Sequence, residues 1–156
     1  MIEVDIPDFG FLRLTHLVLD YNGTLAFDGR LIRGVADKLD SLAEHLDIHI
    51  ITADTFGSAR RAFTSSPCTV HVLPPGSEAE GKAVYVRRLG CPSSVCIGNG
   101  RNDHLMLREA ALGIAVLQQE GAASQALLAA DIVIPDIIAA LGLLLRPRRL
   151  AATLRS

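Results

Sequence analysis

The residues of this chain that could do chemistry begin with Asp20, which follows the apolar run 17–19. An apolar run of this kind is typical of a buried strand, and the Asn22-Gly23 pair just after it is typical of a turn. Because ligands bind outside the carboxyl ends of parallel strands, Asp20 could hold a metal ion or attack an electrophile. On its own, however, the stretch favours the simpler interpretation of Asp20 as a turn residue, so the other strand ends must decide.

Polar groups follow two further apolar runs in the same way. Thr52 and Asp54 follow the run 48–51, Gly98–Asp103 follows the run 94–97, and Lys82 lies near the start of the helix expected between them. In a parallel sheet these ends open on one edge, where groups distant in sequence converge. A carboxylate that attacks a phosphate needs Mg²⁺ beside it, and Mg²⁺ takes oxygen ligands. A hydroxyl and a lysine can hold phosphoryl oxygens, and glycines let backbone N–H groups approach them, so the residue types fit phosphate chemistry.

The elements that must position these groups alternate between strands and helices. Strands are expected at 16–22, 48–52, 69–73, 94–98, 113–117 and 131–134, and helices at 35–46, 55–63, 78–89, 102–111, 120–130 and 135–145. We also expect hairpins at 2–14 and 26–32, the second with an Asp28-Gly29 turn, and a capping box at Ser77–Glu80. The basic stretch Arg146–Arg149 is expected to be a solvated tail. The alternation predicts an α/β fold with a mainly parallel sheet and helices on both faces.

Length and composition narrow the class of protein. The 156 residues predict a single domain over 1–156, and a net charge of -2 gives no electrostatic case for nucleic acid. Three cysteines without a CxxC pair argue against a disulfide framework or a zinc site, so a reducing cytoplasm is expected. The first residues show no basic, apolar leader, and Pro135 interrupts the longest apolar stretch, so neither a signal peptide nor a membrane span is expected.

Taken together, the motifs resemble those of the haloacid dehalogenase (HAD) superfamily. The match rests on Asp20–Thr24, Thr52, Lys82 and Gly98–Asp103, in that order, and extends over nearly the whole chain. Within that superfamily, the chain is most similar to the phosphorylation domain of P-type ATPases and to the small soluble relatives of that domain. The resemblance implies a three-layer, Rossmann-like fold and a Mg²⁺-dependent hydrolase of phosphomonoesters or acyl phosphates. The segments 24–48 and 55–69 leave no room for a cap domain, so we expect a homo-oligomer, or a large substrate, to cover the site.

The resemblance also implies a role for each motif residue. Asp20 would form an aspartyl-phosphate and bind the metal, Thr52 and Lys82 would hold the phosphoryl group, and Asn22 would offer its backbone carbonyl to the metal. The implied catalytic set is Asp20, Asn22, Thr52 and Lys82; the phosphate-binding set is Gly23, Thr24, Thr52, Ala53, Lys82 and Asn102; and the metal set is Asp20, Asn22, Asn99 and Asp103. The substrate would be a phosphorylated small molecule or protein.

Two positions depart from the pattern of the superfamily's phosphatases. Asn22 replaces the Asp that protonates the leaving group and activates water, which is worth ~10²–10⁴-fold in rate. Asn99 replaces an Asp that ligates the metal, which removes one negative charge and should weaken Mg²⁺ binding. The first departure predicts slow turnover, or a substrate whose leaving group needs no proton. The alternative is a catalytically weak module that binds phosphate or Mg²⁺ for interaction.

Histidines outside the motifs are expected to be structural. His16 begins an expected strand, and His49 and His71 lie inside two others, where packed residues are more common than ligands. His104 follows the last motif and could approach the site, but it suits Zn²⁺ better than Mg²⁺. Asp54 could lie at the rim of the site or cap the following helix.

Overall fold

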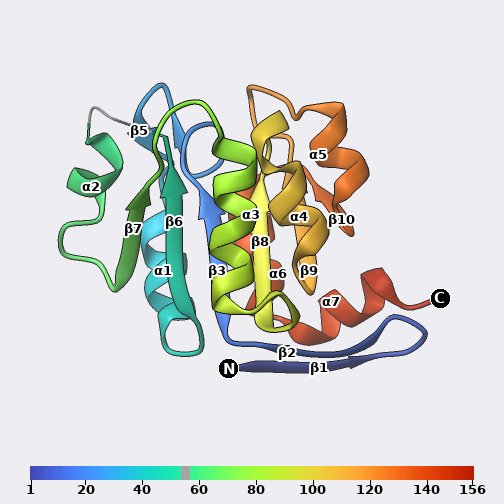
Figure 1. Ribbon diagram of the computed structural model, residues 1–156. Coiled ribbons are helices and arrows are strands. Elements are labelled where there is room, and N and C mark those ends of the chain that lie inside the picture. The colour runs from blue at the N-terminus through green and yellow to red at the C-terminus, as the bar shows by residue number, and fades with distance from the viewer. Residues whose placement is uncertain (54–56) are drawn as a thin grey trace.

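A central sheet of six parallel strands organises the chain in the computed structural model, which describes residues 1–53 and 57–156. The strands are β3 (His16–Asp20), β6 (Asp47–Thr52), β7 (Cys68–Val72), β8 (Ser94–Gly98), β9 (Leu112–Val116) and β10 (Ile132–Ile134), in the spatial order β10-β9-β8-β3-β6-β7. The chain runs from β3 outward to β7, then crosses back to β8 and continues to β10 (Figure 1). The topological switch point therefore lies at the end of β3, and the predicted α/β fold is confirmed.

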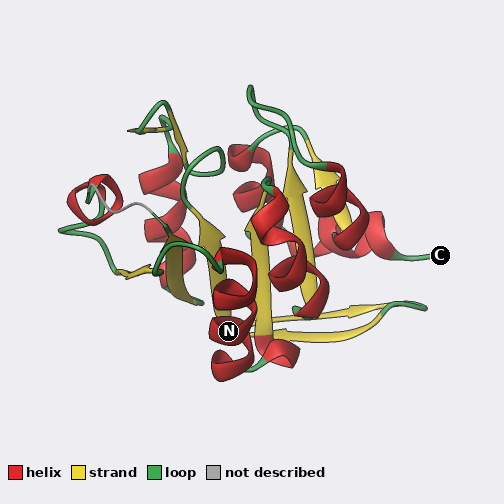
Figure 2. Cartoon of the chain, turned by 45° about the horizontal axis from the view of Figure 1, so that its top comes forward, coloured by secondary structure: helices red, strands yellow, loops and turns green. Residues whose placement is uncertain are grey.

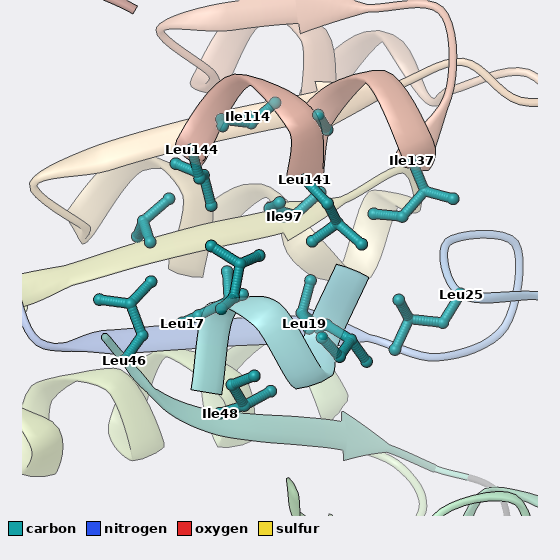
Figure 3. Packing of buried hydrophobic residues seen from close by; sticks show 14 of the residues in the cluster. Leu17, Leu19, Leu25, Leu46, Ile48, Ile97, Ile114, Ile137, Leu141 and Leu144 are labelled. Atoms are coloured by element: carbon teal, nitrogen blue, oxygen red, sulfur yellow. The ribbon is translucent and has the colours of Figure 1, made fainter. Parts of the chain in front are cut away.

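Helices cover both faces of this sheet. On one face lie α1 (Val35–Ala43) and α6 (Ile137–Leu144), and on the other lie α3 (Glu78–Leu89), α4 (His104–Glu109) and α5 (Ser124–Ala129) (Figures 1 and 2). Side chains alternate between the faces of a strand. Leu17 and Leu19 of β3 accordingly pack in the cluster beneath α1 and α6, whereas Val18 packs in the cluster beneath α3 and α4 (Figure 3). Both faces of β3 are buried, which fixes the direction and register of the strand that carries Asp20.

Two hairpins lie at opposite edges of the sheet. Strands β1 (Ile2–Ile6) and β2 (Gly10–Leu14) pair beneath the amino ends of the strands, and β4 (Ala26–Phe27) and β5 (Arg30–Leu31) pair beyond the carboxyl ends (Figure 1). Asp28 and Gly29 both have positive φ, 49° and 74°, as a two-residue turn of type I′ requires. Both predicted hairpins are confirmed, and the second lies beside the edge where the polar strand ends meet.

The structure shortens one predicted helix and adds one helix that was not predicted. The segment 120–130 is helical only over α5, because Gly121 adopts a φ of 78° and the backbone N–H of Ala123 bonds to the carbonyl of Asn99 at 2.9 Å. The arginines of the basic stretch Arg146–Arg149 are exposed, as predicted, but the stretch enters the helix α7 (Pro147–Leu154), which begins at a proline, packs near β1 and buries Leu150. In the first case a hydrogen bond to a distant segment sets where the helix begins, and in the second the burial of one helix face stabilises the additional helix.

Smaller differences occur in the short helical turns and at the starts of helices. Ser77 makes no side-chain bond to the first turn of α3, so the predicted capping box is wrong there; a carboxylate oxygen of Glu78 instead accepts from the N–H of Gly76 at 3.3 Å. The expected helix at 102–111 is divided into a 3₁₀ turn, η2 (Arg101–Asp103), and α4. A second 3₁₀ turn, η1 (Cys91–Ser93), precedes β8. Of the helix expected at 55–63, α2 (Ser58–Ala62) is described, and the proposed cap Asp54 lies outside the described residues.

Within residues 1–53 and 57–156, no helix combines the length and apolar character needed to cross a membrane.

Candidate active site

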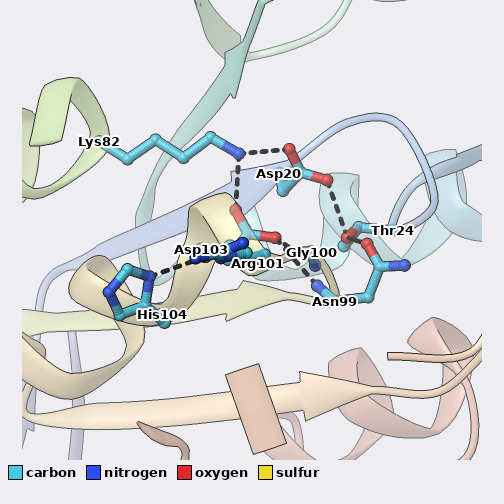
Figure 4. Close-up of polar contacts among 8 residues, drawn as sticks. All are labelled: Asp20, Thr24, Lys82, Asn99, Gly100, Arg101, Asp103 and His104. Carbon is cyan, nitrogen blue, oxygen red and sulfur yellow. Dashed lines mark hydrogen bonds and ion pairs between the residues drawn. The ribbon is translucent and has the colours of Figure 1, made fainter. Parts of the chain in front are cut away.

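Asp20 ends β3 at the switch point of the sheet and faces a lysine from the opposite layer. The side chain of Lys82, from α3, is fully buried, and its Nζ lies 2.6 Å from Asp20 Oδ1 (Figure 4). Asp20 itself is only 6% exposed. A buried lysine of this kind requires charged partners, because an unpaired ammonium is strongly disfavoured away from water.

Asp103 is the second partner of Lys82. Its Oδ1 also lies 2.6 Å from Lys82 Nζ, so one ammonium bridges two carboxylates (Figure 4). Burial would lower the pKa of Lys82, but Asp20 and Asp103 outweigh it and hold that pKa above its ordinary value. Burial and the charge of Asp20 raise the pKa of Asp103 to about 6, against the opposing effect of Lys82. With both carboxylates ionised, the cluster keeps one negative charge in excess, which favours a bound cation.

The second oxygen of Asp103 holds the loop that follows β8. Asp103 Oδ2 accepts from the N–H groups of Asn99 and Gly100 at 3.0 and 2.8 Å. Gly98 is required by this contact, because a Cβ added there would lie 2.5 Å from Asp103 Cγ. The first role of Asp103 is therefore to position Lys82 and the Asn99 loop.

Thr24 brings two acceptor oxygens together. Its Oγ1 lies 3.1 Å from Asp20 Oδ2 and 3.2 Å from Asn99 Oδ1 (Figure 4). The amide nitrogen of Asn99 donates to the carbonyl of Gly121 at 3.0 Å, which turns Oδ1 of Asn99 toward Asp20. A hydroxyl has a single hydrogen and cannot fully satisfy both acceptors at once, so the two oxygens converge where a cation would serve them better.

The donor set fits a hard cation such as Mg²⁺. Asp20 Oδ2 and Asn99 Oδ1 are the oxygens that converge beside Thr24, and oxygen is what Mg²⁺ prefers. In the described parts of the chain, no group of three or more His, Cys, Asp or Glu side chains could hold a metal ion. A cation here would accordingly rely on Asp20, on amide and main-chain oxygens, and on water, which Mg²⁺ keeps readily.

A loop between β9 and α5, residues 117–123, completes this side of the site and was missed by the sequence reasoning. Gln118, with a φ of 53°, donates from Nε2 to the carbonyl of Thr24 at 2.6 Å. Gly23 has a φ of 78°, and a Cβ added there would lie 2.7 Å from Asn99 Nδ2 and 2.7 Å from Glu120 Oε2. The polar run Gln118–Gly121 at a strand end is the signal in the sequence, although part of it falls in the helix predicted at 120–130.

The remaining predicted residues lie around this centre. Thr52 is buried at the end of β6, which neighbours β3, and Ala53 follows it half-buried. Asn102 is half-buried in η2, beside Asp103. Asn22 is exposed and forms an isolated bridge with Ala26 in the turn after β3. The sequence-predicted residues thus gather at one edge of the sheet.

His104 does not face this centre. Its Nδ1 donates to the carbonyl of Arg101 at 2.7 Å, within the turn that begins α4 (Figure 4). His16 and His49 instead contact each other on the sheet, with 3.4 Å between their ring nitrogens, and Nδ1 of His49 lies 3.0 Å from the Tyr85 hydroxyl. Burial and the neighbouring His16 lower the pKa of His49. These contacts agree with the prediction that the histidines have structural roles.

Two cavities flank the centre and could receive the rest of a substrate. One of about 410 Å³ lies between Gly23, the β4–β5 hairpin and the start of α6, and is lined mainly by apolar side chains such as Phe27 and Ile137. The other, of about 450 Å³, lies between the starts of α3 and α4 and includes Arg101 and Asn102.

Comparison with solved structures defines the class of fold. The 3-deoxy-D-manno-octulosonate 8-phosphate phosphatase of Moraxella catarrhalis, solved with magnesium, phosphate and its sugar, has a TM-score of 0.66 at 19% identity over 91% of this chain and 94% of that chain. A cobalt-bound phosphatase of the same type from Haemophilus influenzae has a TM-score of 0.69 at 12% identity, over 92% of this chain and 94% of that chain. The catalytic domain of the CPx-ATPase CopB-B has a TM-score of 0.60 at 23% identity, over 73% of this chain and 46% of that chain. The chain has the fold of the HAD superfamily, as the motifs predicted.

Sequence comparison adds a narrower relationship. No protein-family model matches the chain. Two uncharacterized proteins of Methanocaldococcus jannaschii do match: MJ0073 at 54% identity over 61 residues, which are 39% of this chain, and MJ0072 at 46% identity over 39 residues, which are 25% of this chain. The matched segments span 66% of MJ0073 and 89% of MJ0072. The chain belongs to the same family as MJ0072.

Proposed function

We propose that this protein is a Mg²⁺-dependent phosphatase or phosphotransferase that works through an aspartyl-phosphate on Asp20. The observation that carries the proposal is the bridge of Lys82 between Asp20 and Asp103, at 2.6 Å to each, beside the oxygens that converge at Thr24. A carboxylate at a topological switch point, with a fixed ammonium on one oxygen and a cation site on the other, is suited to attack on phosphorus.

In the first step, a carboxylate oxygen of Asp20 would bond to phosphorus as the bond from phosphorus to the leaving oxygen breaks. Lys82, which contacts Asp20 Oδ1, would stabilise the charge on the phosphoryl oxygens, with the buried Thr52 on the neighbouring strand as a further donor. A bound Mg²⁺ would supply charge neutralisation between the anionic phosphate and the anionic Asp20. Asp20 Oδ2, Asn99 Oδ1 and the backbone carbonyl of Asn22 would hold it.

In the second step, water would attack the phosphorus of the aspartyl-phosphate, releasing phosphate and restoring Asp20. Asn22 has no proton to give to the leaving group and cannot take one from water, and its amide side chain lies on the exposed turn after β3. We therefore propose slow hydrolysis of ordinary phosphomonoesters and faster reaction with acyl phosphates, whose leaving group needs no proton.

The substrate in this proposal is a phosphorylated small molecule. The flanking cavities, of about 410 and 450 Å³, are large enough for a small organic group beside the phosphoryl position. The structural neighbours named for a sugar-phosphate substrate support this class, without indicating which compound is used. Between β3 and β6 the chain forms only the short β4–β5 hairpin and α1, so a second copy of the chain could cover the site; a monomeric mass by light scattering would argue against that part.

The decisive experiment compares the unsubstituted protein with Asp20→Asn. Each would be incubated with Mg²⁺ and acetyl phosphate, and phosphate release and acid-stable, hydroxylamine-sensitive phosphorylation would be measured. We expect both signals from the unsubstituted protein and neither from the variant. Equal rates in the two proteins would refute the aspartyl-phosphate mechanism.

A second candidate function is a weakly catalytic module that binds phosphate or Mg²⁺ for interaction. The amides at Asn22 and Asn99 favour it, because they stand where acid–base catalysis and a metal-ligating charge are expected. Binding of Mg²⁺ and phosphate without any turnover, even of acyl phosphates, would select this alternative.

A further inference from the structure

The exposed carboxylate of Glu120 lies against the cation side of the candidate active site. A Cβ added at Gly23 would meet Glu120 Oε2 at 2.7 Å, Asn99 Nδ2 at 2.7 Å and Asn99 Oδ1 at 2.9 Å. All three atoms therefore surround one small space above the turn that follows Asp20. Within residues 1–53 and 57–156, Glu120 forms neither a hydrogen bond nor an ion pair, so its charge is not neutralised by a neighbouring side chain.

The loop that carries Glu120 is held in place from both sides. Asn99 Nδ2 donates to the carbonyl of the next residue, Gly121, at 3.0 Å, and the N–H of Ala123 donates to the carbonyl of Asn99 at 2.9 Å. On the other side, Gln118 Nε2 donates to the carbonyl of Thr24 at 2.6 Å. These bonds fix the backbone around Glu120 to the two segments that supply the proposed cation ligands, so the carboxylate can reach them.

The candidate active site carries less negative charge than three ionised carboxylates would give it. Asn99 is neutral, and its Oδ1 faces Asp20 Oδ2 across the Thr24 hydroxyl. Lys82 offsets one of the two buried carboxylates that it bridges. A divalent cation at this point would accordingly meet less negative charge from the buried residues than three carboxylates would supply.

We propose that Glu120 supplies this missing charge and strengthens binding of a divalent cation beside Asp20, an inference that rests on the proposed cation-dependent function. Its position over Gly23, beside the Asn99 side chain, suits a contact with the cation through water. Mg²⁺ keeps several of its waters when bound to proteins, and a carboxylate is a strong acceptor for them. Glu120 is thus a positioning residue for the cation and its water shell. Its carboxylate supplies the negative charge that the neutral side chain of Asn99 does not.

The test measures Mg²⁺ binding to the whole chain by calorimetry, at low ionic strength and without substrate. We expect Glu120→Gln to weaken binding roughly fivefold to tenfold, because one negative charge beside the proposed cation ligand Asn99 is lost. Glu44→Gln is the matched control, since it removes the same charge from an exposed residue at the end of α1, toward the amino edge of the sheet. The control should bind Mg²⁺ as the unsubstituted protein does.

The comparison of the two variants decides the proposal. Equal affinities for Glu120→Gln and Glu44→Gln would overturn the role of Glu120 while leaving the proposed phosphatase intact. An unsubstituted protein that binds no Mg²⁺ would overturn both.

Discussion

Removing the charge of Lys82 is the most informative perturbation of this protein. Its ammonium lies 2.6 Å from both Asp20 and Asp103, and Lys82 and Asp103 are each fully buried. Lys82→Met keeps the length of the side chain but leaves two buried carboxylates facing each other. Breaking a buried ion pair in this way costs ~3–5 kcal/mol of folding free energy, because the remaining charge has no partner. For a domain of this size, that loss lowers the melting temperature by roughly 10 °C.

The assay is urea unfolding with EDTA present, at pH 8 and at pH 5. We expect the loss to be largest at pH 8 and smaller at pH 5. Without Lys82, burial and the charge of Asp20 would still raise the pKa of Asp103, so the folded variant would take up a proton there first and gain stability as the pH falls.

Two further variants control for the loss of the long side chain. Lys38→Met changes the other lysine of the chain, which is partly exposed on α1, and should cost less than about 1 kcal/mol. Adding Asp103→Asn to Lys82→Met should recover part of the stability by removing one unpaired charge. A loss below about 1 kcal/mol for Lys82→Met, or a loss independent of pH, would refute the argument that the bridge is essential to the fold.

Three other predictions concern neighbouring groups. Gly23→Ala should abolish Mg²⁺ binding and should lower the melting temperature more than the control Gly29→Ala does. Both glycines have positive φ, 78° and 74°, but only at Gly23 would the added Cβ strike Asn99. Equal melting temperatures for the two variants would contradict this prediction. Asn22→Asp should raise turnover of phosphomonoesters ~10²–10⁴-fold and that of acyl phosphates far less, as measured by phosphate release, because only the former need a proton donor. With EDTA present, burial raises the pKa of Asp103 from 3.8 to about 6, so the folded state binds the extra proton, and the free energy of unfolding should rise as the pH falls from about 6 toward 4. The same measurement on Asp103→Asn is the control, and the difference between the two rises in unfolding free energy gives the contribution of Asp103. Identical pH profiles for the two proteins would contradict the prediction.

The sequence was sufficient to predict a parallel sheet and to bring the candidate site residues to one edge of it. Apolar runs of strand length that alternate with helical patterns imply a parallel sheet, and parallel strands place their carboxyl ends on one edge. That rule alone brings Asp20 near Asp103 and near Lys82, which is 62 positions away in the chain. The types of these residues then predicted phosphate chemistry, and the fold comparison confirms the fold that was predicted with it.

Only the tertiary structure decided which atoms meet. The two oxygens of Asp103 are directed to Lys82 and to the loop after β8, and the amide of Asn99 is oriented by the carbonyl of Gly121. The same contact keeps Glu120 in a loop, although its local pattern had suggested a helix. Periodicity in the sequence reports which face of an element is buried, because burial repeats with the geometry of strands and helices. It carries no record of hydrogen bonds between distant loops, and in this protein those bonds complete the side of the site where we propose that a cation binds.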